Sequence, residues 1–527
     1  MKIMKALFVL LLTSYAIAAQ ALPAQVVFHV GLGQASSTSV SGRLLVFAKP
    51  VKPGDTAYDA AEVDTAPFAP QAVSIAARDV ATFGPERAVS IDTQQTAFPA
   101  GFASLPPGDY RVQAVLDRDG DYNYGGRGPG DLVSKVVTVH LPETAPAAIA
   151  LDQVLPESGL WDFPDASAEA RARIAAARPH LGEVIFPSPA LTAFAGRPIA
   201  IRAWVLTPPG YDPKGKATWP TVYQTGGFGT THKADIAAAS RIWALEADRA
   251  IPPMIWVFLD HSGPTGTTEF ADSVNNGPWG EALTTELIPA LEQDWRMDAR
   301  PSGRFLTGHS SGGWAALWLQ VRYPRLFGGS WPTSPDPADF HDFTGIDLYA
   351  PGANAYVDAA GKPHPLIRDH DRLIATLSDF ARLETVVGED GGQLRSFEWV
   401  FSPRGADGRP MPMFDRVTGA VHPDVMAYWR DHYDIAHLIE THWPALKADL
   451  DGKIHLTIGT ADTFYLDGAA HRLEAAMQRV GAHASFTYLP NKTHMDLYER
   501  DGDRQALTKD IARAIYAVAR PGAQPNS

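Results

Sequence analysis

The sequence predicts an α/β fold, a mostly parallel sheet with helices on both faces, preceded by an all-β sandwich domain. Strand-like and helix-like runs alternate from about residue 184 onward, which is typical of such a sheet. Residues 22–145 instead carry short β-branched runs between Gly, Pro and Asp clusters, without useful helical periodicity, which is typical of a small sandwich. A glycine-flanked serine between a strand and a helix, at 308–312, indicates that the candidate reactive site lies in the α/β part.

The first 21 residues have the form of a secretory signal peptide. Lys2 and Lys5 flank the start, residues 6–12 are apolar, and small residues at 16–18 or 19–21 offer a cleavage site. We therefore expect an exported protein, periplasmic or secreted. Because no later stretch is long and apolar enough, we expect no membrane span in the mature chain; an uncleaved membrane anchor is the alternative.

Composition excludes several classes of function. The 527 residues carry a net charge of −14 without a long basic run, which argues against a nucleic-acid partner. The chain has no cysteine, which excludes disulfides, thiol catalysis and cysteine-based zinc sites. We expect neither a metal nor a cofactor in the active site.

In the β domain, residues 43–48, 110–116 and 132–141 are the clearest strands. Asp117, Asp119 and Asp121 alternate as in calcium loops, but Gly128 stands where an EF-hand has glutamate. Calcium binding and a plain hairpin turn both stay open here. Residues 146–183 are interpreted as a linker that contains an alanine-rich helix.

The predicted catalytic domain spans 184–334 and 453–520. Its expected elements are strands at 198–206, 220–224, 254–260, 304–307, 327–332, 453–459 and 485–489, and helices at 232–249, 279–296, 312–322, 468–480 and 503–519.

Residues 335–452 interrupt this alternation, and 118 residues are too many for a loop. Their aromatic content, including Trp399, Trp429 and Trp443, argues against disorder. We expect a cap inserted over the carboxyl ends of the strands, where ligands bind in α/β sheets. Its histidines fit no standard zinc spacing.

The segment Gly308-His309-Ser310-Ser311-Gly312 follows a strand and opens a helix that Pro324 ends. This order predicts the nucleophile elbow of the α/β-hydrolase fold, with Ser310 as nucleophile. Bulkier residues at Gly308 or Gly312 are expected to collide with the adjoining strand and helix.

A serine hydroxyl needs a base and a carboxylate that orients the base, and in this fold the order is serine, acid, histidine. Asp462 follows the strand 453–459, and His494 lies in a loop after the strand 485–489. The alternatives left open are Asp467 or Asp496 as the acid and His455 or His483 as the base.

Catalysis also needs donors for the oxyanion. The amide of Ser311 is one candidate, and an amide of Gly227 or Phe228 in the loop 225–229 is the other. Asn275, Asn276 and Trp279 lie before a helix and could line a substrate pocket, although a structural loop explains them equally well.

From about 184 to 520 the chain resembles the putative-esterase family, which includes S-formylglutathione hydrolase (esterase D), enterochelin esterases, feruloyl esterases and mycolyltransferases. The matching segments are ELIP at 286–289, GHSSGGWAAL at 308–317, YPRLF at 323–327 and GTADTF at 459–464. The last resembles the acid-bearing segment of the esterase D branch, which favours Asp462 over Asp467. Esterase D-like enzymes lack both the long insertion and the β domain.

Together these observations predict an exported serine hydrolase that cleaves a carboxylic ester through an acyl-enzyme, with Ser310, Asp462 and His494 as a triad. The substrate is expected to be a small-molecule or polymer-linked ester. An acyltransferase that uses the same triad and a serine peptidase are the alternative functions.

Overall fold

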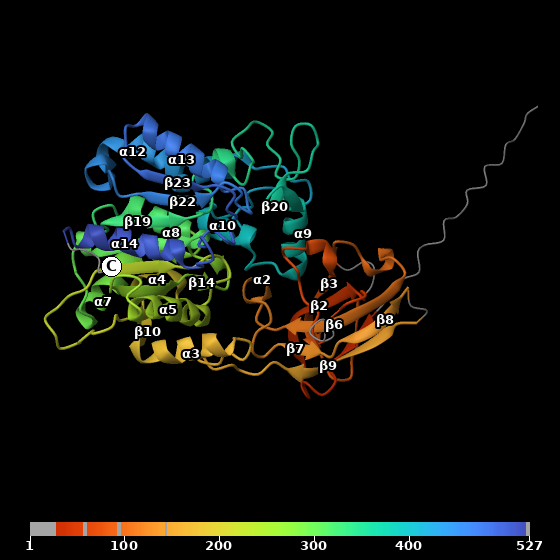
Figure 1. Cartoon of the computed structure of the whole chain (residues 1–527). Coiled ribbons are helices and arrows are strands. Elements are labelled where there is room, and N and C mark those ends of the chain that lie inside the picture. Colours follow the sequence, from red (N-terminus) through yellow and green to blue (C-terminus); the bar gives the residue numbers. More distant parts are fainter. Residues whose placement is uncertain (1–27, 56–60, 92–95, 143–144, 523–527) are drawn as a thin grey trace, which may run out of the picture.

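The computed structural model describes residues 28–55, 61–91, 96–142 and 145–522 (Figure 1). The predicted signal peptide, residues 1–21, lies outside these ranges. Among the helices that are described, none combines the length and the apolar character needed to cross a membrane.

The N-terminal part is a β domain whose strands form one network in the order β4-β1-β9-β7-β6-β2-β3-β5, with β8 paired to β6. The strands are β1 (Phe28–Gly31), β2 (Val40–Pro50), β3 (Ser74–Phe83), β4 (Val89–Ile91), β5 (Thr96–Phe98), β6 (Gly108–Asp117), β7 (Leu132–Ser134), β8 (Val137–Leu141) and β9 (Ala147–Val154). Short helical turns are η1 (Pro70–Ala72), η2 (Phe102–Ser104) and α2 (Tyr122–Gly125). β9 lies in the segment predicted as a linker, yet it pairs with β1 in parallel and with β7 in antiparallel orientation.

Residues 44–48 of β2 are all buried. Because successive side chains point to opposite sides of a strand, this part of β2 is covered on both faces. Leu44 and Val46 enter a core shared with β1 and β9, which shows that the strand network curls around on itself. Leu45 and Phe47 enter a second core, to which Leu383 of the insertion contributes. The β domain is therefore covered on its other face by a segment more than 300 residues further along the chain.

The catalytic sheet has eight strands in the order β10-β11-β13-β12-β18-β19-β22-β23. Their bounds are β10 (Leu181–Pro187), β11 (Ala200–Leu206), β12 (Thr221–Thr225), β13 (Ile255–Asp260), β18 (Arg304–His309), β19 (Gly329–Thr333), β22 (His455–Gly459) and β23 (Ser485–Leu489).

This sheet is mixed, which corrects the prediction of a mostly parallel one. β11 runs antiparallel to both of its neighbours, β10 and β13, whereas the pairings from β13 to β23 are parallel. The prediction failed because the apolar pattern of a strand does not record its direction. The connection from β10 to β11 contains the short helix α4 (Pro189–Ala195).

Helices cover both faces of the catalytic sheet (Figure 1). One face packs against α3 (Ala168–Ala177), α5 (His232–Ala247) and α14 (Ala506–Ala519). The other packs against α6 (Trp279–Ala282), η4 (Leu283–Leu287), α7 (Ile288–Asp294) and α8 (Ser311–Arg322). Here the single helix predicted at 279–296 is divided by a π-helical turn, η4. Four two-residue strands, β14 (Ser262–Gly263), β15 (Gly266–Thr267), β16 (Asp272–Ser273) and β17 (Gly277–Pro278), and the turns η3 (Arg178–His180) and η5 (Pro301–Gly303) complete this part.

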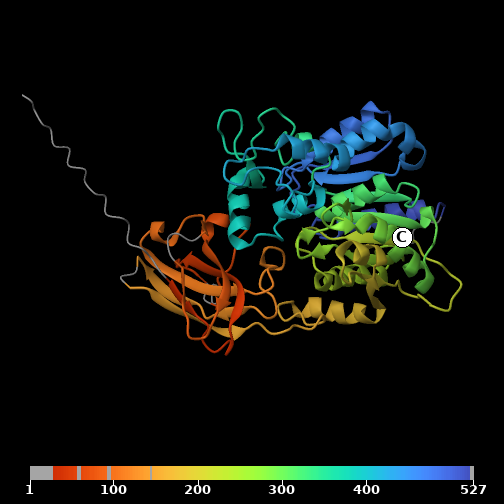
Figure 2. The same ribbon diagram turned by 180° about the vertical axis from the view of Figure 1, so that it is seen from behind.

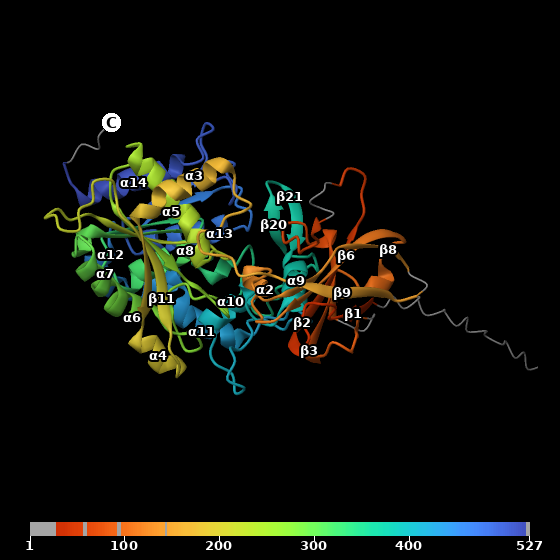
Figure 3. The same ribbon diagram turned by 90° about the horizontal axis from the view of Figure 1, so that it is seen from below.

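The insertion between β19 and β22 is folded and packs on α8. It contains η6 (Phe340–Asp342), β20 (Pro365–Asp369), β21 (Arg372–Thr376), α9 (Leu377–Val387), α10 (Gln393–Phe401), α11 (Pro423–Tyr433) and α12 (Ile435–Leu450), and α13 (Asp467–Arg479) follows β22. Its aromatic residues share one core with Trp314 and Trp318 of α8. α9 extends from this body to the β domain (Figures 2 and 3), so the insertion joins the two parts of the molecule.

Candidate active site

Ser310 lies at a strained turn between β18 and α8. Its φ of 59° and ψ of −125° form a left-handed conformation that costs energy for any residue with a Cβ. Two hydrogen bonds hold the turn: the Ser310 N–H donates to the Thr333 carbonyl at 3.0 Å, and the Ser310 carbonyl accepts from the Trp314 N–H at 3.0 Å. The serine therefore stands at the carboxyl end of β18, at the first turn of α8.

Glycine is required on both sides of this serine because β18, α8 and β12 meet there. A Cβ on Gly308 would lie 2.1 Å from the Gly312 carbonyl oxygen, and a Cβ on Gly312 would lie 2.1 Å from the Thr225 carbonyl oxygen. These obstacles are backbone atoms in a close-packed interior, so they cannot give way cheaply. The spacing of the motif follows from this close approach.

Asp462 follows β22 and His494 follows β23, and the two side chains meet in the interior. His494 Nδ1 and Asp462 Oδ2 are 2.9 Å apart, and the residues are 4% and 0% exposed. The other oxygen of the carboxylate, Oδ1, accepts hydrogen bonds from the amides of Phe464 at 2.9 Å and Leu466 at 3.4 Å. Burial by itself would raise the pKa of Asp462, but His494 and the amides together lower that pKa below its ordinary value.

The other candidate acids and bases have different partners. Asp467 forms an ion pair with Arg368 at 3.0 Å, and Asp496 accepts a hydrogen bond from the Thr493 hydroxyl at 2.7 Å. His483 lies 2.9 Å from Asp451, and the His455 ring stacks on the Trp331 ring with centroids 4.5 Å apart. Each therefore has a local structural role, and the candidate acid and candidate base that contact each other are Asp462 and His494.

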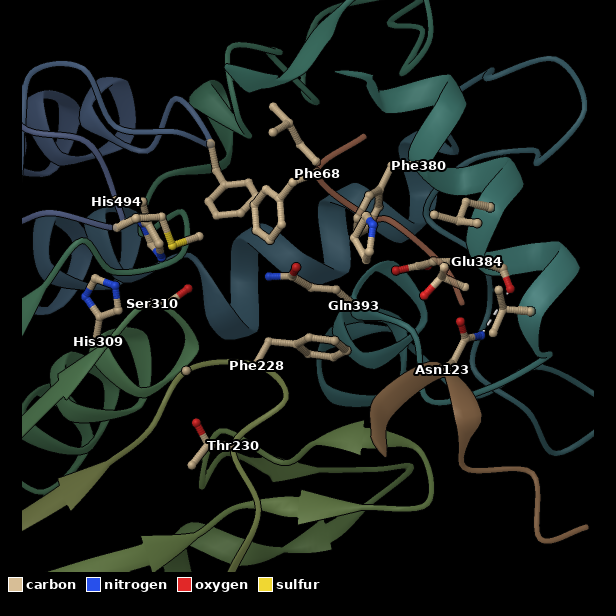
Figure 4. Close-up of a pocket in the computed structure, with 18 of the residues that line it drawn as sticks. Phe68, Asn123, Phe228, Thr230, His309, Ser310, Phe380, Glu384, Gln393 and His494 are labelled. Atoms are coloured by element: carbon tan, nitrogen blue, oxygen red, sulfur yellow. Dashed lines mark hydrogen bonds between the residues drawn. The ribbon is translucent and has the colours of Figure 1, made fainter. Parts of the chain in front are cut away.

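Ser310 and His494 line one pocket of about 450 Å³. In Figure 4 the Ser310 hydroxyl lies beside the His494 imidazole at one end of this pocket. The rings of Phe464 and His494 meet almost at a right angle, with centroids 4.9 Å apart. The three predicted catalytic side chains thus come together at the same place, where a substrate has access to the serine.

Gly227 and Phe228 line the same pocket. A Cβ on Gly227 would lie 3.2 Å from Ser310 Cβ, so the backbone of this loop runs directly past the serine. Ser311 begins α8, where backbone N–H groups are free of intrahelical acceptors. The two predicted sources of oxyanion donors therefore flank Ser310.

Two polar residues near the serine were missed by sequence reasoning. Asp336, just beyond β19, accepts a hydrogen bond from the Ser311 hydroxyl at 2.6 Å, and burial raises its pKa to about 6. His309 packs on His494 with ring centroids 4.3 Å apart. Burial, and then the charge of His494, lower the pKa of His309 to about 3, so His309 is neutral. Its place beside Ser310 in the motif is the one signal that could have identified it.

The predicted pocket residues Asn275, Asn276 and Trp279 do not line this pocket. The Asn275 amide donates to the Ser402 carbonyl at 2.8 Å, and the Trp279 indole donates to the Asn276 carbonyl at 3.0 Å. The first of these bonds ties the loop to the insertion and the second lies within the loop, so these residues have the structural role that was the alternative for them.

Carboxylate oxygens of Asp117, Asp119 and Asp131 lie within 4.8 Å of one another. The group differs from the predicted Asp117, Asp119 and Asp121 because it includes Asp131, which directly precedes β7. Amide donors already occupy part of it: Gly120 donates to Asp117 at 2.9 Å, and Gly128 donates to Asp131 at 2.8 Å. These hydrogen bonds are what a structural turn requires.

Residues 198–507 match the model of a family described as putative esterase. The matched stretch contains Ser310, Asp462 and His494. A comparison with curated proteins found no match.

Similar solved structures include a ferulic acid esterase, with 12% identity, 64% of this chain and 98% of that chain covered, and a TM-score of 0.40. Another is FphF, a fluorophosphonate-binding serine hydrolase of Staphylococcus aureus, with 12% identity, coverages of 64% and 98%, and a TM-score of 0.37. A third is an S-formylglutathione hydrolase from Agrobacterium tumefaciens, with 16% identity, coverages of 64% and 94%, and a TM-score of 0.35.

The family match extends over more than half of the chain, and it supports a hydrolase of the esterase type. The motifs around Ser310 and Asp462 point to the same relationship. The chain belongs to the putative esterase family.

Proposed function

We propose that the protein is an exported serine esterase that hydrolyses a carboxylic ester through an acyl-enzyme. The observation that carries this proposal is the buried contact of 2.9 Å between His494 and Asp462 beside Ser310 at its strained turn. A serine hydroxyl becomes a useful nucleophile only next to a base that a carboxylate holds in place. Export rests on the form of residues 1–21.

In this mechanism Asp462 accepts a hydrogen bond from His494 Nδ1–H, which leaves Nε2 unprotonated and free to act as a base. Nε2 takes the Ser310 hydroxyl proton as the oxygen attacks the ester carbonyl, and the amide of Ser311 and one amide of the 227–228 loop stabilise the oxyanion. The imidazolium then protonates the leaving alcohol, and the acyl group stays on Ser310.

Water completes the cycle. His494 removes a proton from a water molecule that attacks the acyl-enzyme, the oxyanion forms again, and the acid is released as Ser310 recovers its proton. Because Asp462 is fully buried and its pKa is lowered, it stays ionised through the cycle and stabilises each imidazolium that forms.

The test is hydrolysis of a panel of p-nitrophenyl and natural esters by the full chain, together with labelling by a fluorophosphonate probe. Ser310→Ala is expected to abolish both, whereas Ser302→Ala, at an exposed serine before β18, is expected to retain both. A wild-type chain that neither hydrolyses an ester nor reacts with the probe would disprove the proposal. Transfer of the acyl group to an acceptor alcohol present in excess, faster than release to water, would instead support the acyltransferase alternative.

A further inference from the structure

The pocket at Ser310 is built from three parts of the chain. The α/β core contributes Ser310, His494 and Phe228, the insertion contributes Phe380 and Gln393 among others, and the β domain contributes residues of the segments 65–68 and 122–123. Figure 4 shows these side chains around one cavity. The β domain therefore forms part of the wall that a bound substrate would contact.

Contacts with α9 hold the β domain at the pocket. Asn123 Nδ2 donates to the carbonyl oxygen of Glu384 in the last turn of α9 at 3.0 Å. It also donates to two carbonyl oxygens just beyond α9, those of Gly388 at 3.1 Å and Asp390 at 3.2 Å. Arg43 of β2 donates to the Val386 carbonyl at 2.9 Å and 3.0 Å. Buried side chains of α9 complete the second core of the β domain, so this wall is fixed rather than loosely placed.

Phe68 of the β domain lies close to the reacting groups. Its ring is 6.1 Å from that of Phe464, and Phe464 contacts His494. Phe68 is 49% exposed, which is unusual for so large an apolar side chain, and part of that exposed surface faces the pocket (Figure 4). An apolar group attached to the ester would cover it and gain the free energy of its burial.

Gln393, at the first turn of α10, provides a polar contact in this largely apolar pocket. Figure 4 shows its carboxamide directed into the cavity towards Ser310. Within the ranges that the structure describes, this carboxamide forms no hydrogen bond, so its donors and its acceptor are free for a ligand. A few such polar groups in an apolar pocket are what orient a ligand.

We propose that Phe68 of the β domain and Gln393 of the insertion determine substrate specificity, an inference that rests on the proposed esterase function. They select esters in which a bulky apolar group adjoins the ester and carries a hydrogen-bonding substituent, such as a hydroxyl. Phe68 covers the apolar group, and the Gln393 carboxamide binds the substituent. The β domain is thus a part of the substrate site rather than an appendage.

The experiment compares kcat and KM of the full chain on ethyl acetate and on the ethyl esters of 3-phenylpropanoic and 3-(4-hydroxyphenyl)propanoic acid. Acetates of the two corresponding propanols place the same groups on the alcohol side. Phe68→Ala and Phe68→Leu are compared with Phe194→Ala, a phenylalanine of similar exposure (43%) in α4 that does not line the pocket. Gln393→Leu is compared with Gln478→Leu on the exposed face of α13.

Phe68→Ala is expected to lower kcat/KM for the bulky esters about tenfold, mainly through KM, and to lower it much less for ethyl acetate, which carries no group large enough to cover Phe68. Gln393→Leu is expected to remove a preference of about three- to tenfold for the hydroxylated ester. Equal losses on every ester, or no difference from the two control variants, would overturn the specificity proposal. Fluorophosphonate labelling separates the two proposals. If the variants show no change in substrate preference but the wild-type chain is labelled, the specificity proposal fails and the proposed function stands. If the wild-type chain is not labelled, the proposed function itself fails.

Discussion

Replacing Asp462 by asparagine is expected to slow ester hydrolysis by about 10³- to 10⁴-fold while the chain stays folded. The orientation of the new amide follows from its neighbours. Oδ1 of Asp462 accepts hydrogen bonds from two backbone amides, whereas Oδ2 faces His494 Nδ1. The asparagine oxygen will keep the place beside the two amide donors, so its NH₂ group will face Nδ1.

This arrangement places the imidazole in the wrong tautomer. Nδ1 must accept from the asparagine, the proton moves to Nε2, and Nε2 can no longer take a proton from Ser310. Turning the amide round would leave two buried N–H donors without acceptors, at about 2–4 kcal/mol. Loss of the charge-assisted bond to the imidazolium adds about 1.5–3 kcal/mol. The sum, about 3.5–7 kcal/mol, brackets the barrier increase of about 4–5.5 kcal/mol that the rate loss stated above corresponds to.

The assay is kcat for p-nitrophenyl acetate at neutral pH, with thermal melting to confirm folding. Asp467→Asn is the matched control, because Asp467 begins α13 just after Asp462 in the chain and pairs with Arg368 at 3.0 Å at a partly exposed site. Such a pair contributes little, so the control is expected to keep its activity within about threefold. An Asp462→Asn enzyme that retains a tenth of the wild-type rate, or an equal loss in Asp467→Asn, would refute the reasoning.

Three further predictions concern folding and stability. Gly312→Ala should lower the melting temperature sharply, because the new Cβ would lie 2.1 and 2.3 Å from backbone oxygens. The control Gly101→Ala should not lower it, since its Cβ would meet nothing within 4 Å. Equal melting temperatures of the two variants would contradict this prediction. Burial raises the pKa of Glu384 from 4.5 to about 7. Between these two pH values the folded state binds more protons than the unfolded state, so the free energy of unfolding should fall as pH rises. In urea titrations Glu384→Gln should reduce this fall by on the order of 3 kcal/mol, and an unchanged pH dependence would contradict the prediction. Asn123→Ala should make the β domain more sensitive to protease, because the carbonyl oxygens of Glu384, Gly388 and Asp390 lose their donor. An unaltered digestion rate would show that these hydrogen bonds do not hold the β domain in place.

The sequence was most informative where local geometry and chemistry coincide. The elbow at Ser310 could be predicted because the close approach of three backbone segments admits only glycine at Gly308 and Gly312. Asp462 and His494 could be placed because each follows a strand whose apolar pattern is evident from the sequence, and parallel strands end at the same edge of a sheet.

Contacts between distant segments could not be predicted in the same way. Periodicity shows that Leu45 and Phe47 are buried, but it does not record that Leu383 covers them. It also does not record strand direction, which is why the strand at 198–206 was predicted but the antiparallel direction of β11 was not. The substrate wall of Phe68 and Gln393 depends on both of these long-range arrangements.

The most direct test of the central claim is the site of acylation. The wild-type chain is mixed with a slowly hydrolysed p-nitrophenyl ester, quenched in acid, and analysed by intact mass and peptide mapping. A mass increase equal to one acyl group, located on Ser310 and formed with a burst of p-nitrophenol, is the predicted result. Turnover of the ester with no acyl group on Ser310, or with the acyl group on another residue, would contradict the proposal.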